Sequence, residues 1–145
     1  MSQDVSLADQ WACNATIQRF SVYVDAGRYD DAASLFATDG VLQRPLERIE
    51  GRAALLQSFG TRPAHRLTRH VISNVLVDAG TGADHLRAHS YVCVYRHLGA
   101  PGQRLALPVA SQAPETMAEY VDELVRVDDR WLISHRTVRP IFDVV

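Results

Sequence analysis

The pattern of apolar positions divides the chain into a helical first part and an extended second part. From Leu7 to Phe20, apolar side chains recur at close to helical spacing, which predicts a helix over residues 6–26. Ser6 is a suitable N-cap for this helix, and Gly27 is a suitable end. The elements predicted next are helices over 30–37 and 50–60, a turn at 38–40 and a short strand at 41–44.

The second part is rich in β-branched and aromatic residues, which favour strands. It predicts strands at 66–78, 86–98, 117–127 and 130–138, with an irregular proline- and glycine-containing segment at 99–115. Asp128 and Asp129 are expected to form the tight turn of the last hairpin. Helices that precede a run of mostly antiparallel strands indicate an α+β fold. We expect one domain over residues 1–145, with the helices against one face of a strongly curved sheet.

The segment Val71–Val77 is apolar on both of its faces. A strand with one wet face would show alternating apolar and polar residues. Both faces are therefore expected to be covered, one by the helices and one by something else. A second subunit is the simplest cover, which favours a homodimer. Packing of the segment 99–115 of the same chain is the competing explanation.

The composition is that of an ordinary folded protein, with 47% hydrophobic and 22% charged residues among 145. A formal net charge of −2 gives no electrostatic basis for binding nucleic acid or an anionic membrane. The sequence has no apolar run as long as a membrane span and no secretory-signal pattern, so the cytoplasm is the expected location. Cys13 and Cys93 are expected to be reduced, buried thiols, and no metal or cofactor is expected.

Two polar residues on otherwise apolar elements are the main candidates for chemistry. Asp25 lies near the end of the first predicted helix, and His70 lies at the start of the first long strand. Alternation along that strand is expected to place four residues on one face: His70, Ile72, Asn74 and Leu76. A buried imidazole needs a partner, and a carboxylate would hold its tautomer and stabilise the imidazolium formed after proton capture. The pair is therefore a candidate proton-abstracting site.

Arg136 is the polar exception on the last strand, where it is expected to share a face with Leu132, Ser134 and Val138. An arginine among apolar neighbours could stabilise a developing oxyanion or an anionic substrate group. Each of these assignments has a structural alternative. The helix aspartate could point into water, the histidine and the asparagine could serve only packing or the backbone, and the arginine could form an ion pair at the surface or in an interface.

Four stretches carry a resemblance to a known family: VDAGRYDDAASLFATDGV, EGRAALLQSF, RHVISN and YVDELVRVDDRWLISHRTVRPIF. In this order and spacing the chain resembles the SnoaL-like branch of the nuclear transport factor 2-like superfamily, over roughly residues 8–142. The resemblance implies an α+β cone in which a curved sheet and N-terminal helices enclose a pocket, often in a dimer. This fold hosts dehydratases, isomerases, cyclases, dehydrohalogenases and non-catalytic binders.

Within the superfamily, the chain is most similar to the group of scytalone dehydratase, hexachlorocyclohexane dehydrochlorinase and bile-acid dehydratase. The resemblance implies that Asp25 and His70 form a catalytic dyad. It also implies that Arg136 and Asn74 bind the polar end of the substrate.

Two positions depart from these relatives. Phe20 stands where some of them carry Tyr or Lys five residues before the helix aspartate. Val24 directly precedes that aspartate, and the pair of substrate-orienting tyrosines of scytalone-type enzymes is not evident. Phe20 and Val24 are expected to contact the substrate, and the resemblance names no single activity.

The expected function is a cofactor-independent, dehydratase-like lyase or isomerase. It would abstract a proton from a small apolar cyclic substrate, such as a polyketide, steroid, terpenoid or aromatic intermediate, with His70 as base and Asp25 as its orienting acid. The alternatives are a polyketide cyclase-type enzyme, a non-catalytic ligand-binding or assembly domain, and a small β-type subunit of a ring-hydroxylating oxygenase.

Overall fold

The computed structural model describes residues 4–111 and 114–143. Three helices and six strands lie within these ranges: α1 (Leu7–Asp25), α2 (Tyr29–Ser34), β1 (Phe36–Arg44), β2 (Glu47–Glu50), α3 (Arg52–Gly60), β3 (Arg66–Gly82), β4 (His85–Leu98), β5 (Thr116–Val127) and β6 (Arg130–Asp143). None of the described helices is both long and apolar enough to cross a membrane.

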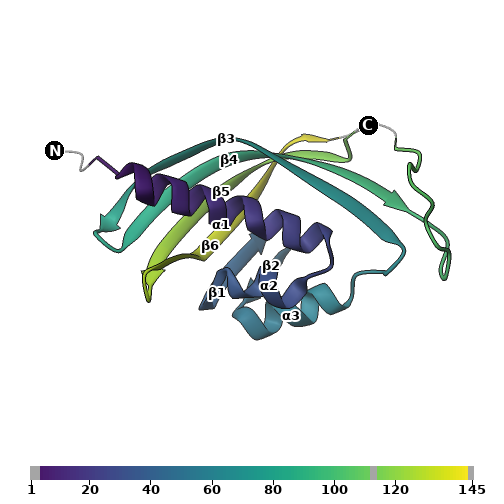
Figure 1. Ribbon diagram of the computed structural model, residues 1–145, viewed down its shortest axis with the longest axis horizontal. Coiled ribbons are helices and arrows are strands. Elements are labelled where there is room, and N and C mark those ends of the chain that lie inside the picture. The colour runs from purple at the N-terminus through teal and green to yellow at the C-terminus, as the bar shows by residue number, and fades with distance from the viewer. Residues whose placement is uncertain (1–3, 112–113, 144–145) are drawn as a thin grey trace.

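The six strands form one open, mixed sheet in the order β2-β1-β6-β5-β4-β3. All neighbouring strands are antiparallel except β1 and β6, which are parallel. The long strands curve over α1, which lies along their inner side, while α2, α3, β1 and β2 gather near its C-terminal end (Figure 1). The predicted α+β fold with a curved, mostly antiparallel sheet is confirmed.

Helix α1 sets the position of the carboxylate that ends it. Its first turn is capped by Ser6, whose hydroxyl oxygen accepts a hydrogen bond from the backbone N–H of Asp9 at 3.1 Å. Its buried face packs on the sheet and includes Cys13, Ile17 and Phe20. The helix ends at Asp25, and the chain then turns through Gly27, whose φ of +72° suits glycine.

The region after α2 differs from the sequence prediction. Residues 38–40, predicted as a turn, lie inside β1, and β2 was not predicted at all. The cause is long-range pairing, because Phe36 lies opposite Ile133 of β6 and Val41 lies opposite His135 across a register shift. Gly40 sits at this irregularity, where a Cβ atom would lie 2.9 Å from the carbonyl oxygens of Ala37 and Ile133.

A bulge in β3 changes the side chains that face inward. The register against β4 shifts between Ser73 and Leu76, and Asn74 adopts a φ of +53°. Beyond the bulge, Val75 and Val77 pack against the core, while the Leu76 side chain is 59% exposed. The predicted face of His70, Ile72, Asn74 and Leu76 is therefore wrong after Ile72, because one extra residue reverses the alternation.

A second register shift affects the last hairpin. Asp128 and Asp129 form its turn as predicted, with φ values of +49° and +60°. Further along, the register between β5 and β6 shifts at Ser134, so that Ile133 lies opposite Leu124 and Arg136 lies opposite Asp122. The predicted alternation of Leu132, Ser134 and Arg136 on one face therefore does not hold, although Arg136 does face inward.

The outer face of the sheet stays open in the single chain. Val71 and Phe142 are 53% and 61% exposed there, so the segment 99–115 does not cover them within the part of the chain that the structure describes. The inner face, by contrast, is covered by α1. Both cysteines are free as expected, but Cys93 is only half-buried, because it belongs to this outer face.

Candidate active site

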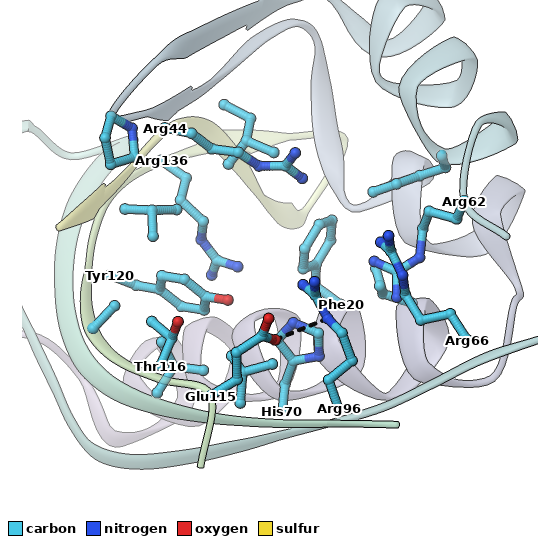
Figure 2. A pocket seen from close by; sticks show the side chains of 18 residues that line it. Phe20, Arg44, Arg62, Arg66, His70, Arg96, Glu115, Thr116, Tyr120 and Arg136 are labelled. Carbon is cyan, nitrogen blue, oxygen red and sulfur yellow. Dashed lines mark ion pairs between the residues drawn. The ribbon is translucent and has the colours of Figure 1, made fainter. Parts of the chain in front are cut away.

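A cavity of about 310 Å³ lies between the inner face of the sheet and the C-terminal half of α1 (Figure 2). This volume suits a small ring compound. The cavity is lined by α1, β1, α3 and the long strands β3–β6. Four residues predicted for the site line it: Phe20, Val24, His70 and Arg136. Asn74 does not line it, because the bulge in β3 exposes that side chain.

The structure brings Asp25 and His70 together, although 45 positions separate them in the chain. The Oδ1 atom of Asp25 lies 2.6 Å from Nδ1 of His70, and Oδ2 accepts a hydrogen bond from the backbone N–H of His70 at 2.8 Å. The two side chains are 9% and 16% exposed, respectively. Because α1 ends at Asp25 and the carboxylate holds both the ring and the backbone of His70, the imidazole is fixed in position.

The charge of Asp25 decides the tautomer of His70. Burial raises the pKa of the Asp25 carboxyl, but the hydrogen bonds from His70 and Thr68 outweigh burial and hold the pKa below its ordinary value. An ionised carboxylate can only accept hydrogen bonds, so Nδ1 of His70 carries the hydrogen. The Nε2 atom then holds a lone pair, makes no hydrogen bond to the described residues, and belongs to a ring that lines the cavity.

Thr68 and Arg62 add two hydrogen bonds to the contact between Asp25 and His70. The sequence analysis did not single out either residue. The buried Thr68 hydroxyl donates to Oδ1 of Asp25 at 2.8 Å and accepts from Nη2 of Arg62 at 3.0 Å. Thr68 lies two residues before His70 on β3, before the bulge, so strand alternation could have placed it on the same face.

Arg136 lies on β6, in the wall of the cavity, and is fully buried. Asp122 holds it by two hydrogen bonds, from Nε to Oδ1 at 2.7 Å and from Nη2 to Oδ2 at 2.8 Å. Burial lowers the pKa of Arg136, but the Asp122 carboxylate outweighs burial and raises the pKa above its ordinary value. The third nitrogen, Nη1, is buried without a hydrogen-bond partner in the described part of the chain.

Tyr120 is a cavity residue that the sequence analysis did not single out. Its ring centroid lies 4.0 Å from the Arg136 guanidinium carbon, and its hydroxyl points into the cavity beside that guanidinium (Figure 2). Burial raises the pKa of Tyr120, so the hydroxyl keeps its proton and can donate it in a hydrogen bond. The available signal was the alternation Tyr120, Asp122, Leu124, which places an acid and a phenol on one buried face.

The cavity therefore presents a base nitrogen on β3 and hydrogen-bond donors on β5 and β6. An apolar wall, which includes Phe20, Val24 and Val92, completes it. Among residues 4–111 and 114–143, no group of three or more His, Cys, Asp and Glu side chains is placed to hold a metal ion.

Comparison with protein families assigns residues 5–137 to the SnoaL-like domain. The chain belongs to the SnoaL-like family. This match covers nearly all of α1 through β6, including both Asp25 and His70. None of the curated proteins compared with this SnoaL-like chain matches its sequence.

Solved structures with the same fold include three proteins of bacterial origin. A candidate scytalone dehydratase from Novosphingobium aromaticivorans has a TM-score of 0.74 and 21% identity, over 94% of this chain and 86% of that one. ActVI-ORFA from Streptomyces coelicolor has a TM-score of 0.74 and 20% identity, over 89% and 95%. A Catenulispora acidiphila protein in complex with S-DNPA has a TM-score of 0.75 and 21% identity, over 93% and 95%. At these identities the likeness establishes the SnoaL-like fold alone.

Proposed function

We propose that this protein is a cofactor-independent, dehydratase-like lyase or isomerase that uses His70 as a general base. The observation that carries the proposal is the 2.6 Å contact between Asp25 and Nδ1 of His70, with the ring on the cavity wall. The contact leaves Nε2 free to accept a proton, and an imidazole held by a carboxylate is an oriented base. The resemblance to scytalone dehydratase-type relatives supports the same roles for these two residues.

The proposed reaction begins when Nε2 of His70 removes a proton from a carbon next to a carbonyl group. The electron pair of the broken C–H bond moves into the carbonyl and forms an enolate. Asp25 stabilises the imidazolium, while Nη1 of Arg136 and the hydroxyl of Tyr120 donate hydrogen bonds to the enolate oxygen. The enolate then re-forms the carbonyl. In an elimination, its electrons form a C=C bond as the C–O bond of the neighbouring carbon breaks, and the imidazolium gives its proton to the departing oxygen, which leaves as water. In an isomerisation, the imidazolium gives its proton to another carbon.

The substrate is proposed to be a small, mostly apolar ring compound, such as a polyketide, steroid, terpenoid or aromatic intermediate. A cavity of about 310 Å³ with phenylalanine and valine walls suits such a body. The structural likeness to ActVI-ORFA and to a candidate scytalone dehydratase is consistent with a small-molecule substrate. We also propose that the protein is located in the cytoplasm.

Two model substrates test the reaction without knowledge of the natural one. Exchange of the C–H bonds next to the carbonyl of 2-tetralone is followed by proton NMR in D₂O, and loss of water from 3-hydroxy-1-tetralone is followed by absorbance of the naphthol formed. We expect the protein to accelerate at least one reaction. The variants His70→Ala and Asp25→Asn should lower that rate by about 10²- to 10⁴-fold.

The matched control is His85→Ala, which removes an exposed histidine outside this cavity. It should leave the rate unchanged, and circular dichroism should show that all variants stay folded. Full activity in His70→Ala would overturn the mechanism. A protein that binds ring compounds in the cavity but accelerates neither reaction would instead be a non-catalytic binding domain.

We further propose that the protein forms a homodimer through the outer face of its sheet. Four side chains form a row across neighbouring strands on that face: Val71, Cys93, Met117 and Phe142, each opposite the next in the strand register. Val71 and Phe142 are 53% and 61% exposed in the single chain. An exposed apolar row of this kind is typical of a surface that is buried in an assembly.

Sedimentation velocity tests the dimer. The wild-type protein should sediment as a dimer, and the double variant Val71→Glu, Phe142→Glu should sediment as a folded monomer, because it places two charges in the contact. A wild-type protein that stays monomeric at tens of micromolar contradicts the dimer.

A further inference from the structure

One end of the cavity carries more positive charge than the residues around it neutralise. Arg62, Arg66 and Arg96 line this end, and Figure 2 shows their guanidinium groups directed toward the cavity, on the side away from Tyr120. We call these three residues the arginine cluster. Glu115 is the one acidic residue among the residues that line the cavity.

The carboxylates near the cavity already have other partners, and for Asp25 these are His70 and Thr68. Glu115 contacts Nε of Arg96 at 2.8 Å, and Asp122 is held by the buried Arg136. In the described part of the chain, no carboxylate oxygen lies within 4.0 Å of Arg62 or Arg66. The hydrogen bond that Arg62 does make is to the neutral hydroxyl of Thr68. Two guanidinium charges at this end therefore form no ion pair with any carboxylate of the described residues.

The surroundings of Arg66 are unfavourable for its positive charge. Its Nε is buried without a hydrogen-bond partner in the described residues. Burial, then the charges of Arg96 and Arg62, lower the pKa of Arg66, and Glu115 opposes them only in part. The cluster does not follow from overall basicity, because the whole chain has a formal net charge of −2. A negative group bound between these guanidinium groups would offset the repulsion.

We propose that the arginine cluster binds an anionic oxygen group of the substrate, a carboxylate or a phosphate, through Arg62 and Arg66. Guanidinium groups present paired N–H donors that match both groups. The apolar ring of the substrate would then extend along the cavity toward Phe20 and His70. This inference rests on the proposed function for the position of the ring, and it narrows the substrate class from apolar rings to ring acids or ring phosphates.

The proposal also assigns a role to the hydrogen bond from Arg62 to Thr68. Arg62 donates to the hydroxyl that itself donates to Asp25, so Arg62 lies two hydrogen bonds, and a group bound to it three, from the carboxylate that holds His70. An anion at the cluster would help to fix the Arg62 side chain and, through Thr68, the position of Asp25.

Calorimetric titration with matched ligands tests the charge preference and needs no turnover. The ligands are 2-naphthoate, its neutral methyl ester and 2-naphthyl phosphate. We expect the wild-type protein to bind naphthoate or naphthyl phosphate at least about tenfold more tightly than the ester, because hydrogen bonds to charged groups are among the stronger ones. The stronger of the two anions identifies the natural group. Rising salt concentration should weaken the binding of the two anions and leave the binding of the ester unchanged.

Three variants show whether the arginine cluster causes the preference. Arg66→Gln should reduce it to about threefold or less, and Arg66→Lys should retain part of it because the charge remains. The control Arg87→Gln removes an exposed positive charge outside the cavity and should retain all of it. Equal binding of the anions and the ester, no binding of either anion at millimolar concentration, or equal loss of all three ligands in Arg66→Gln would overturn the proposal. A charge preference without any turnover would leave this inference standing and remove the proposed reaction instead.

Discussion

Two aspartates of this SnoaL-like protein hold nitrogen bases at the wall of one cavity, and their surroundings differ. Asp25 and His70 are 9% and 16% exposed, whereas Asp122 and Arg136 are 0% and 1% exposed. Asp25 also accepts hydrogen bonds from a hydroxyl and a backbone N–H. An imidazole has a ring nitrogen that can accept a proton, whereas a guanidinium keeps its charge and has no acceptor nitrogen.

The difference separates two tasks that a proton-transfer site requires. In the proposed reaction, the more accessible pair, Asp25 with His70, accepts a proton from the substrate and returns it through the free ring nitrogen on the cavity wall. The sealed pair, Asp122 with Arg136, keeps a positive charge fixed at one place, because Asp122 holds two of the guanidinium nitrogens. The fixed positive charge of Arg136 is therefore suited to stabilise the negative charge that would develop on the substrate in the proposed reaction.

The largest effect should follow from breaking the sealed pair. Asp122→Ala leaves Arg136 buried without its partner, so the free energy of unfolding should fall by about 3–5 kcal/mol, measured by urea denaturation. The control Asp31→Ala breaks the contact of Asp31 with Arg28, whose side chains are 51% and 57% exposed. That change should cost about 0–1 kcal/mol. Equal losses in the two variants would show that the Asp122 contact is no stronger than a surface pair.

A smaller effect should follow from weakening the accessible pair. Thr68→Val keeps the shape of the side chain but removes the hydroxyl that donates to Asp25. We expect the rate of 2-tetralone exchange to fall about tenfold, the loss expected for a hydrogen bond to a charged group. NMR titration should also show a rise in the pKa of Asp25 toward its ordinary value. Thr81→Val, an exposed change near the end of β3, is the control and should alter neither quantity.

The smallest effect is a loss of stability in acid. The pKa of Asp25 is lower in the folded chain than its ordinary value of 3.8, so between the two values the unfolded chain binds the proton and the folded chain does not. Asp25 therefore contributes stability above pH 3.8 that is lost as the pH falls through the folded pKa. The difference in unfolding free energy between wild type and Asp25→Asn should shrink as the pH falls below 3.8. A difference that persists unchanged to acid would contradict the sign of this shift.

Much of the fold could be predicted from periodicity and capping residues. Ser6 caps α1 and the Asp128–Asp129 turn closes the last hairpin, and both signals are local. The predictions failed where distant strands decide the structure. Residues 38–40 resemble a turn, yet they lie in a strand because Phe36 and Val41 pair with β6. No local pattern near Gly40 reports that pairing.

The sequence predicted those parts of the candidate site that depend on single residues. It did not predict those parts that depend on the register between neighbouring strands. Asp25 and His70 stood out as polar residues on apolar elements, and the resemblance joined them. Asn74 was misplaced because a bulge cannot be seen in an alternating sequence of apolar residues. The partner of Arg136 was missed for a related reason, because Asp122 lies opposite it only once the shift at Ser134 is known.

The bulge at Asn74 also has a consequence for redesign of the protein. It divides β3 into a part that carries Thr68 and His70 and a part that carries Val75 and Val77, and the two parts alternate independently. The first part lies at the cavity and the C-terminal end of α1, and the second lies beside the N-terminal half of α1. Side chains that select a ligand can therefore be exchanged on one part while the other continues to seat the helix. Strand β3 thus consists of two segments, joined at Asn74, that can be redesigned separately.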